Sequence, residues 1–117
     1  MGRPLSADEE RVILRILDAD FDGAETLRRQ VGEAFAIRHW IEGLPSIDIM
    51  VGETTPAAPC RVGSPITRTV IDDSGIPIGF VMLWVKEGRI SGLEYAWLTD
   101  DPPTDLPPDE WISASDN

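Results

Sequence analysis

The 117-residue chain contains one cysteine and one histidine, and each scarcity excludes a class of protein. A single cysteine, Cys60, cannot form an internal disulfide, so nothing in the sequence requires an oxidising compartment. A single histidine, His39, has no second histidine with which to hold a metal ion, and no cysteine or carboxylate stands at a metal-ligand spacing from it. We therefore expect neither a disulfide scaffold nor a metal site, and no cofactor.

Motifs of membrane insertion and of catalysis are lacking as well. No apolar run approaches the roughly 20 residues of a membrane span, and residues 1–10 lack the apolar core of a signal peptide. The loop at 52–65 has neither the lysine nor the glycine spacing of a phosphate loop, and no serine lies in a Gly-x-Ser-x-Gly turn. The sequence therefore predicts a cytoplasmic protein, assigns no catalytic residue and favours a binding protein over an enzyme.

Positive charge is scarce, since 10 Lys and Arg residues stand against 21 Asp and Glu, a formal net charge of -11. Nucleic acids and anionic membranes need a basic footprint, so both are excluded as partners, and a neutral or basic protein is expected instead. More than half of the net charge falls on residues 98–117, which contain no base. Such an end is commonly a solvated segment that keeps a protein soluble; the alternative is that it docks on a basic surface.

The N-terminal third has the spacing of two amphipathic helices. Ser6 and Glu9 form a capping box, which predicts a helix from there to about Asp20, with apolar residues at three- and four-residue steps. Asp22 is then placed to cap a second helix, which extends to about Ala34. Helices of this length need a second layer against which to bury their apolar faces.

From residue 35 onward the apolar pattern alternates, as it does in strands. The predicted strands are 35–41, 46–51, 66–72, 78–86 and 89–98. Strand 78–86 is apolar on both faces, which favours a central strand covered on both sides. The sequence therefore predicts an α+β domain over residues 1–98, with two N-terminal helices packed on an antiparallel sheet of four or five strands.

Residues 99–117 are predicted to be an extended, acidic, Pro-rich tail. Four prolines between residues 102 and 108 prevent both helix and strand. Leu106 and Trp111 are spaced to pin the tail onto its own domain or onto another chain. Trp97 and Trp111 flank the acidic segment, and they predict a contact surface that is both aromatic and acidic. Its acidic members are Asp100, Asp101 and Asp105.

A second candidate site centres on Glu94 in the last strand. Gly92 beside it would leave room for a ligand, and a carboxyl group among small and apolar neighbours is how a sheet-lined pocket builds an acid or base. Tyr95 and His39 are its candidate helpers. The alternative is that Glu94 faces solvent or pairs with a cross-strand cation, either Arg68 or Arg89.

Three stretches together resemble a group of small uncharacterised bacterial proteins whose layout is similar to that of toxin-neutralising immunity proteins. They are GRISGLEYAWLTDDPPTDLP, LSADEERVILRILDADFDGAETLRRQV and GLPSIDI. The resemblance implies an α+β domain, is compatible with a role in neutralising a toxin, and transfers no active site.

Three functions follow as hypotheses. The first is an acidic binding protein that occupies a basic protein partner. The second is a small-molecule pocket or modest enzyme that uses Glu94. The third is a homo-oligomeric scaffold in which another subunit covers strand 78–86.

Overall fold

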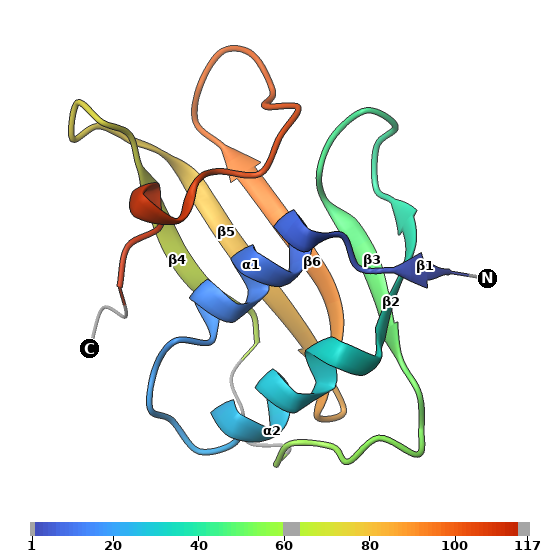
Figure 1. Ribbon diagram of the computed structural model, residues 1–117. Helices are drawn as coiled ribbons and strands as arrows, with labels where there is room; N and C mark the ends of the chain where they lie inside the picture. The colour runs from blue at the N-terminus through green and yellow to red at the C-terminus, as the bar shows by residue number, and fades with distance from the viewer. Residues whose placement is uncertain (1, 60–63, 115–117) are drawn as a thin grey trace.

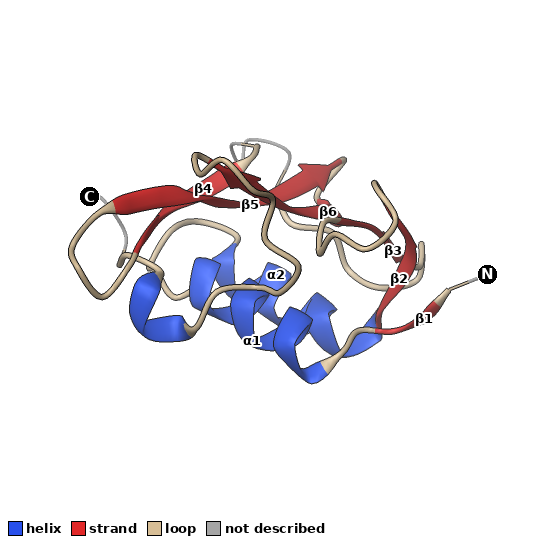
Figure 2. Ribbon diagram, turned by 90° about the horizontal axis from the view of Figure 1, so that it is seen from above, coloured by secondary structure: helices blue, strands red, loops and turns tan. Residues whose placement is uncertain are grey.

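The computed structural model describes residues 2–59 and 64–114, so Cys60 and the last three residues lie outside the described residues. Six strands form one antiparallel sheet in the order β1-β2-β3-β6-β5-β4, and two helices lie on one side of it (Figures 1 and 2). The elements are β1 (Arg3–Pro4), α1 (Ala7–Ile16), α2 (Ala24–Gln30), η1 (Val31–Glu33), β2 (Ala34–His39), β3 (Ile47–Val51), β4 (Ile66–Ile71), β5 (Pro77–Lys86), β6 (Arg89–Trp97) and η2 (Asp109–Trp111). The predicted α+β class is confirmed.

The capping box at the start of α1 is present as predicted. The Glu9 backbone N–H donates to Ser6 Oγ at 3.1 Å, and the Ser6 N–H donates to Glu9 Oε1 at 2.8 Å. The two terminal guanidinium nitrogens of Arg3, Nη1 and Nη2, also donate to the Glu9 carboxylate at 2.8 Å. Burial raises the pKa of Glu9, but the hydrogen bonds from Arg3 and Ser6 outweigh it and hold this pKa below its usual range.

The predicted cap of the second helix is wrong by one residue. The N-cap of α2 is Gly23, with φ 97°, rather than Asp22. A left-handed backbone costs glycine little, so the chain reverses direction there without needing a side-chain cap. The helix that follows is only seven residues long, and it continues into the 3-10 helix η1.

The predicted number of strands, four or five, is also wrong. The sixth strand, β1, has two residues, and it pairs with β2 through Arg3 opposite Ala36 and Pro4 opposite Phe35. Two residues are too few to produce an alternating apolar pattern, so no sequence pattern predicts this strand.

The prediction that strand 78–86 is central is wrong as well, because β5 lies second from the edge, beside β4. Its helix-facing residues Val81 and Leu83 are fully buried, whereas Phe80, Met82 and Trp84 on the other face are half-buried. Both faces of β5 are therefore apolar, although the helices of the described residues cover only one of them.

The core lies between the helices and one face of the sheet. Val12, Ile13 and Ile16 of α1 and Leu27 of α2 expose no surface, and they meet Leu83 of β5, which exposes none either. Removing each such side chain from water stabilises the fold by about 1.5–3 kcal/mol before conformational entropy is subtracted. This single layer of helices fixes the sheet on one side.

A buried amide joins α2 to the turn between β5 and β6. Gln30 exposes no surface, and its Nε2 donates to the carbonyls of Pro56 and Gly88 at 3.0 and 2.9 Å. Its Oε1 accepts the N–H of Ile90 at 3.0 Å. Because both donors and the acceptor are satisfied, the amide stabilises the loop before β4 and the β5–β6 turn together.

We predict that Glu9→Gln lowers the free energy of unfolding by about 1 kcal/mol at pH 7, because the amide keeps the Ser6 contact but loses the charge facing Arg3. A carboxyl whose folded-state pKa is lowered stabilises the fold above its unfolded pKa of about 4.3, and this stabilisation is lost as pH falls through the folded value. Urea unfolding should therefore show the two proteins converging at low pH.

Glu25→Gln is the matched control, because Glu25 is exposed and its ion pair among the described residues is with Arg29, four residues along α2. It should change stability by a few tenths of a kcal/mol. A Glu9→Gln deficit that stays constant as the pH falls to about 3 would show that the carboxylate charge is not the cause.

Candidate functional site

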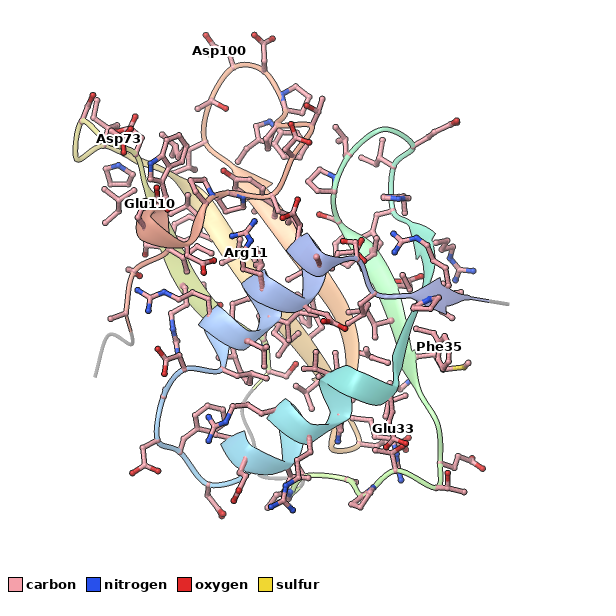
Figure 3. The ribbon with its side chains drawn as sticks, viewed as in Figure 1. Arg11, Glu33, Phe35, Asp73, Asp100 and Glu110 are labelled. Atoms are coloured by element: carbon pink, nitrogen blue, oxygen red, sulfur yellow. The ribbon has the colours of Figure 1, made fainter. Side chains whose placement is uncertain are left out.

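Three segments that carry acidic side chains meet at one end of the sheet. Because β4, β5 and β6 are antiparallel neighbours, the β4–β5 turn and the chain leaving β6 emerge at the same end. Residues 109–112 reach it too, since Ile112 pairs with Val70 near the end of β4. Figure 3 labels Asp73, Asp100 and Glu110 there. We call this region the acidic end, and its carboxylates are those of Asp72, Asp73, Asp100, Asp101, Asp105, Asp109 and Glu110.

Hydrogen bonds within the acidic end hold its segments in place. Asp72 Oδ1 accepts the N–H groups of Ser74 and Ile76 at 2.9 and 3.1 Å, which shapes the β4–β5 turn. Trp111 Nε1 donates to Asp73 Oδ1 at 2.8 Å, so the turn and the C-terminal segment are joined directly. The acids are therefore presented on a folded framework.

The C-terminal segment also contributes to the core and to the sheet. Ile112 is 1% exposed, and Leu106 and Trp111 pack against the core as partly buried residues. The Ser113 N–H donates to the Thr69 carbonyl at 2.9 Å, and its Oγ accepts the Thr69 N–H at 3.1 Å. The sequence left open whether Leu106 and Trp111 hold this segment on its own domain or on another chain. In the structure they hold it on its own domain.

Two arginines of α1 fasten this segment. Arg11 donates to Asp109 Oδ1 at 2.6 Å and to the Pro107 carbonyl at 3.1 Å. Arg15 donates twice to the Ile112 carbonyl, at 2.9 and 3.2 Å. Guanidinium groups that donate to two points of the segment in this way fix the direction of the chain as well as its position.

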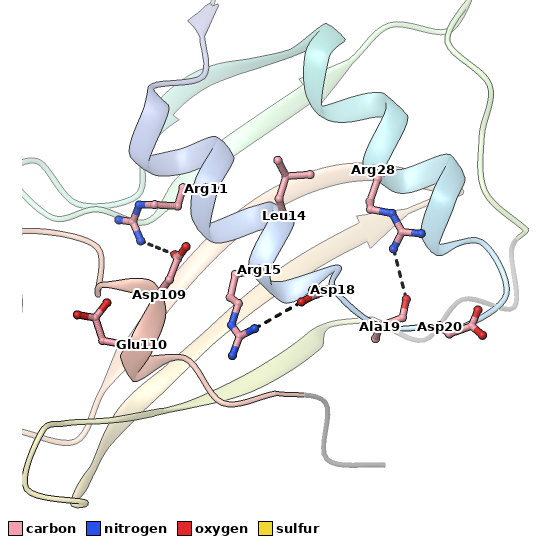
Figure 4. A pocket seen from close by; sticks show the side chains of 9 residues that line it. All are labelled: Arg11, Leu14, Arg15, Asp18, Ala19, Asp20, Arg28, Asp109 and Glu110. Carbon is pink, nitrogen blue, oxygen red and sulfur yellow. Dashed lines mark hydrogen bonds and ion pairs between the residues drawn. The ribbon is translucent and has the colours of Figure 1, made fainter.

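A groove of about 880 Å³ runs between α1, the α1–α2 loop and η2 (Figure 4). Its lining residues are Arg11, Leu14, Arg15, Asp18, Ala19, Asp20, Arg28, Asp109 and Glu110. The three arginines do not form an anion site, because each already donates to the protein. Arg28 donates to the carbonyls of Leu17 and Ala19 at 2.7 and 3.3 Å.

Negative charge at the acidic end is largely uncompensated. Among the salt bridges within residues 2–59 and 64–114, the one that involves a member of the acidic end joins Arg11 to Asp109. Exposed apolar side chains lie beside these acids: Ile76 in the turn is 56% exposed, Trp97 37% and Leu98 61%. Apolar groups among uncompensated acids are typical of a surface that contacts a basic protein.

The five residues predicted to form an aromatic and acidic contact surface differ in their exposure. Trp97, Asp100, Asp101 and Asp105 are exposed at the acidic end, within nine residues of the chain. Trp111 is half-buried against the core and bonded to Asp73, so part of its ring stabilises the domain. Sequence reasoning missed Asp72, Asp73 and Ile76, which are far from residue 100 in the chain and reach the same end through strand pairing.

The structure does not bring Glu94, Tyr95 and His39 together. Glu94 lies on the sheet face away from the helices, where it accepts the Nε1–H of Trp84 at 3.0 Å. Tyr95 is buried on the opposite face, and burial raises the pKa of its phenol. His39 is exposed, and its Nδ1 lies 2.7 Å from the Leu44 carbonyl oxygen.

Glu94 is half-buried, and both cations named as its cross-strand partners donate elsewhere among the described residues, so the pairing is wrong while partial exposure to solvent remains. The residue opposite Glu94 on β5 is Met82. Arg68 is buried on the helix side, where it donates to the Ile16 carbonyl at 2.7 Å. Arg89 donates to the carbonyls of Glu53 and Thr55 in the loop after β3.

The sheet face without helices, which we call the open face, has two tryptophan–carboxylate hydrogen bonds near Gly92. Trp40 Nε1 donates to Asp48 Oδ1 at 2.9 Å, as Trp84 does to Glu94. A Cβ on Gly92 would lie 3.6 Å from Trp40 and 3.7 Å from Trp84, so the two tryptophans flank this glycine. The large apolar side chains of the open face include Phe35, Trp40, Met50, Phe80, Met82 and Trp84. Its polar ones include Arg38, Asp48, Thr67, Thr69 and Glu94.

Among the described residues, no three His, Cys, Asp or Glu side chains are grouped so that they could hold a metal ion. No helix within residues 2–59 and 64–114 has the length and apolarity that crossing a membrane requires. The chain matches no family model, no curated protein and no solved structure.

We predict that Ile112→Ala lowers the free energy of unfolding by about 2–4 kcal/mol, because it leaves a cavity where the C-terminal segment enters the core. Leu98→Ala is the control at an exposed aliphatic residue, and it should stay within about 0.5 kcal/mol of the original protein. Chemical unfolding followed by tryptophan fluorescence measures both. Equal, small effects would mean that residues 106–113 are not part of the cooperative fold.

Proposed function

We propose that this is a non-enzymatic binding protein that occupies a basic surface of another protein through its acidic end. The observation that carries the proposal is the arrangement of seven carboxylates around exposed Ile76, Trp97 and Leu98, with Arg11 in contact with one of them. Complementary charge would steer a basic partner to this end, and the apolar side chains would supply contact area once it arrives.

The framework beneath the acidic end supports the proposal. A surface whose residues are already fixed loses less conformational entropy when it binds than a disordered tail does. The fastening of residues 106–113 by Arg11, Arg15 and Trp111 supplies this fixation. The sequence resemblance to immunity proteins favours a toxin as the partner, which would be neutralised by covering its basic surface.

The test starts from the basic protein that the immobilised chain retains at low salt from a lysate of its native cell, and measures the Kd for the purified pair by calorimetry. A variant with Asp73, Asp100, Asp101 and Asp105 all changed to Asn should bind at least about ten-fold more weakly. Affinity should also fall as salt rises from about 50 to about 300 mM, because these charges are exposed.

The matched control neutralises four acids elsewhere, by changing Asp20 to Asn and Glu25, Glu42 and Glu53 to Gln. All four are exposed, and both variants have the same net charge because each loses four carboxylates. The control should bind within about two-fold of the original protein. If the two variants weaken binding equally, the partner responds to overall charge and the acidic end is not the binding site.

A further inference from the structure

We propose that the open face of the sheet is the contact surface of a homodimer, with a second copy of this chain supplying the layer that the helices supply on the other face. This proposal does not depend on the proposed function, because the acidic end and the open face are different surfaces. It rests on the composition of the open face, its charge and its size.

The open face has the amino-acid composition of a buried surface. In a two-layer protein, the solvent side of an antiparallel sheet is normally polar. Here β5, the second strand from the edge, places Phe80, Met82 and Trp84 at alternate positions on the open face, all half-buried. Met50 and Phe35 extend the apolar surface to β3 and β2, where they stand opposite each other, 52% and 42% exposed. Exposed apolar surface of this extent marks an interaction site.

The charge of the open face favours a second copy as the occupant. Of the 21 acids in the chain, the strands contain only Asp48 and Glu94. Asp48 is already paired with Arg38 at 2.9 Å. The repulsion expected from a net charge of -11 therefore arises from other surfaces, and two open faces can meet with little of it.

The polar groups of the open face are self-complementary in a two-fold pairing. Glu94 accepts a hydrogen bond from Trp84 and faces no cation among the described residues, whereas the Arg38 side chain is 73% exposed two strands away. An isologous interface makes every contact twice, so Arg38 of each copy can meet the Glu94 carboxylate of the other.

The open face is large enough for a stable dimer interface. The molecule measures 42 × 34 × 20 Å, and the sheet extends across a broad side. A standard stable interface needs about 800 Å² from each partner. Face-to-face sheets pack about 10 Å apart, which suits the large side chains of β5.

Sedimentation equilibrium of the full chain between about 1 and about 500 µM tests the proposal. The mass should rise reversibly from 12.9 kDa toward twice that value and stop there. Phe80→Lys and Ala96→Lys should each weaken dimerisation by at least about 100-fold, because each buries an unpaired cation in the interface. Ala96 is opposite Phe80 on β6 and is half-buried, so a lysine there can still reach solvent in a folded monomer.

Leu14→Lys is the matched control, since Leu14 is 41% exposed on α1, on the far side of the molecule. It should dimerise like the original protein. The dimer should also persist in about 500 mM salt, where binding through the acidic end weakens. The proposal is overturned by a monomer at every concentration, by assemblies that grow beyond two copies, or by folded Ala96→Lys protein that dimerises normally.

Discussion

A six-stranded sheet has two faces, and the described chain supplies helices for only one of them. Hydrophobic burial is the main favourable term in folding, so the helix-covered face determines where the core lies. The helices place Ile13 and Ile16 against Val81 and Leu83, and the alternation of strands then forces Phe80, Met82 and Trp84 to the other face. The apolar open face is thus a direct consequence of a strand that is apolar at every position from Ile78 to Val85.

The C-terminal segment shows how a sequence rich in acid and proline can still be part of a fold. Its prolines prevent it from adding a regular strand, but buried apolar residues and two arginines help to hold it. Leu106 and Ile112 pack inward, while Arg11 and Arg15 of α1 bind its carbonyls from outside. The acids between and around these anchors then remain at the surface, beside those of the β4–β5 turn.

Features of the structure that depend on neighbouring residues can be predicted from the sequence, whereas features that depend on distant residues cannot. The capping box of Ser6 and Glu9 and the apolar patterns of β3 to β6 are local signals. The start of α1 and these four strands were predicted correctly from them. Strand order is a long-range property, so the placement of β5 at the centre was wrong. The pairing of Trp84 with Glu94 was missed for the same reason, because it crosses between strands and no local pattern encodes it.

The proposed function requires that the acidic end is a fixed surface rather than a mobile tail. Amide hydrogen exchange of Ser113 tests it most directly, because this N–H donates to Thr69 across the edge of the sheet. The account predicts protection approaching that of the Val81 amide in the sheet, since both would be released only by global unfolding. Exchange of Ser113 at the rate of an unfolded chain would contradict it.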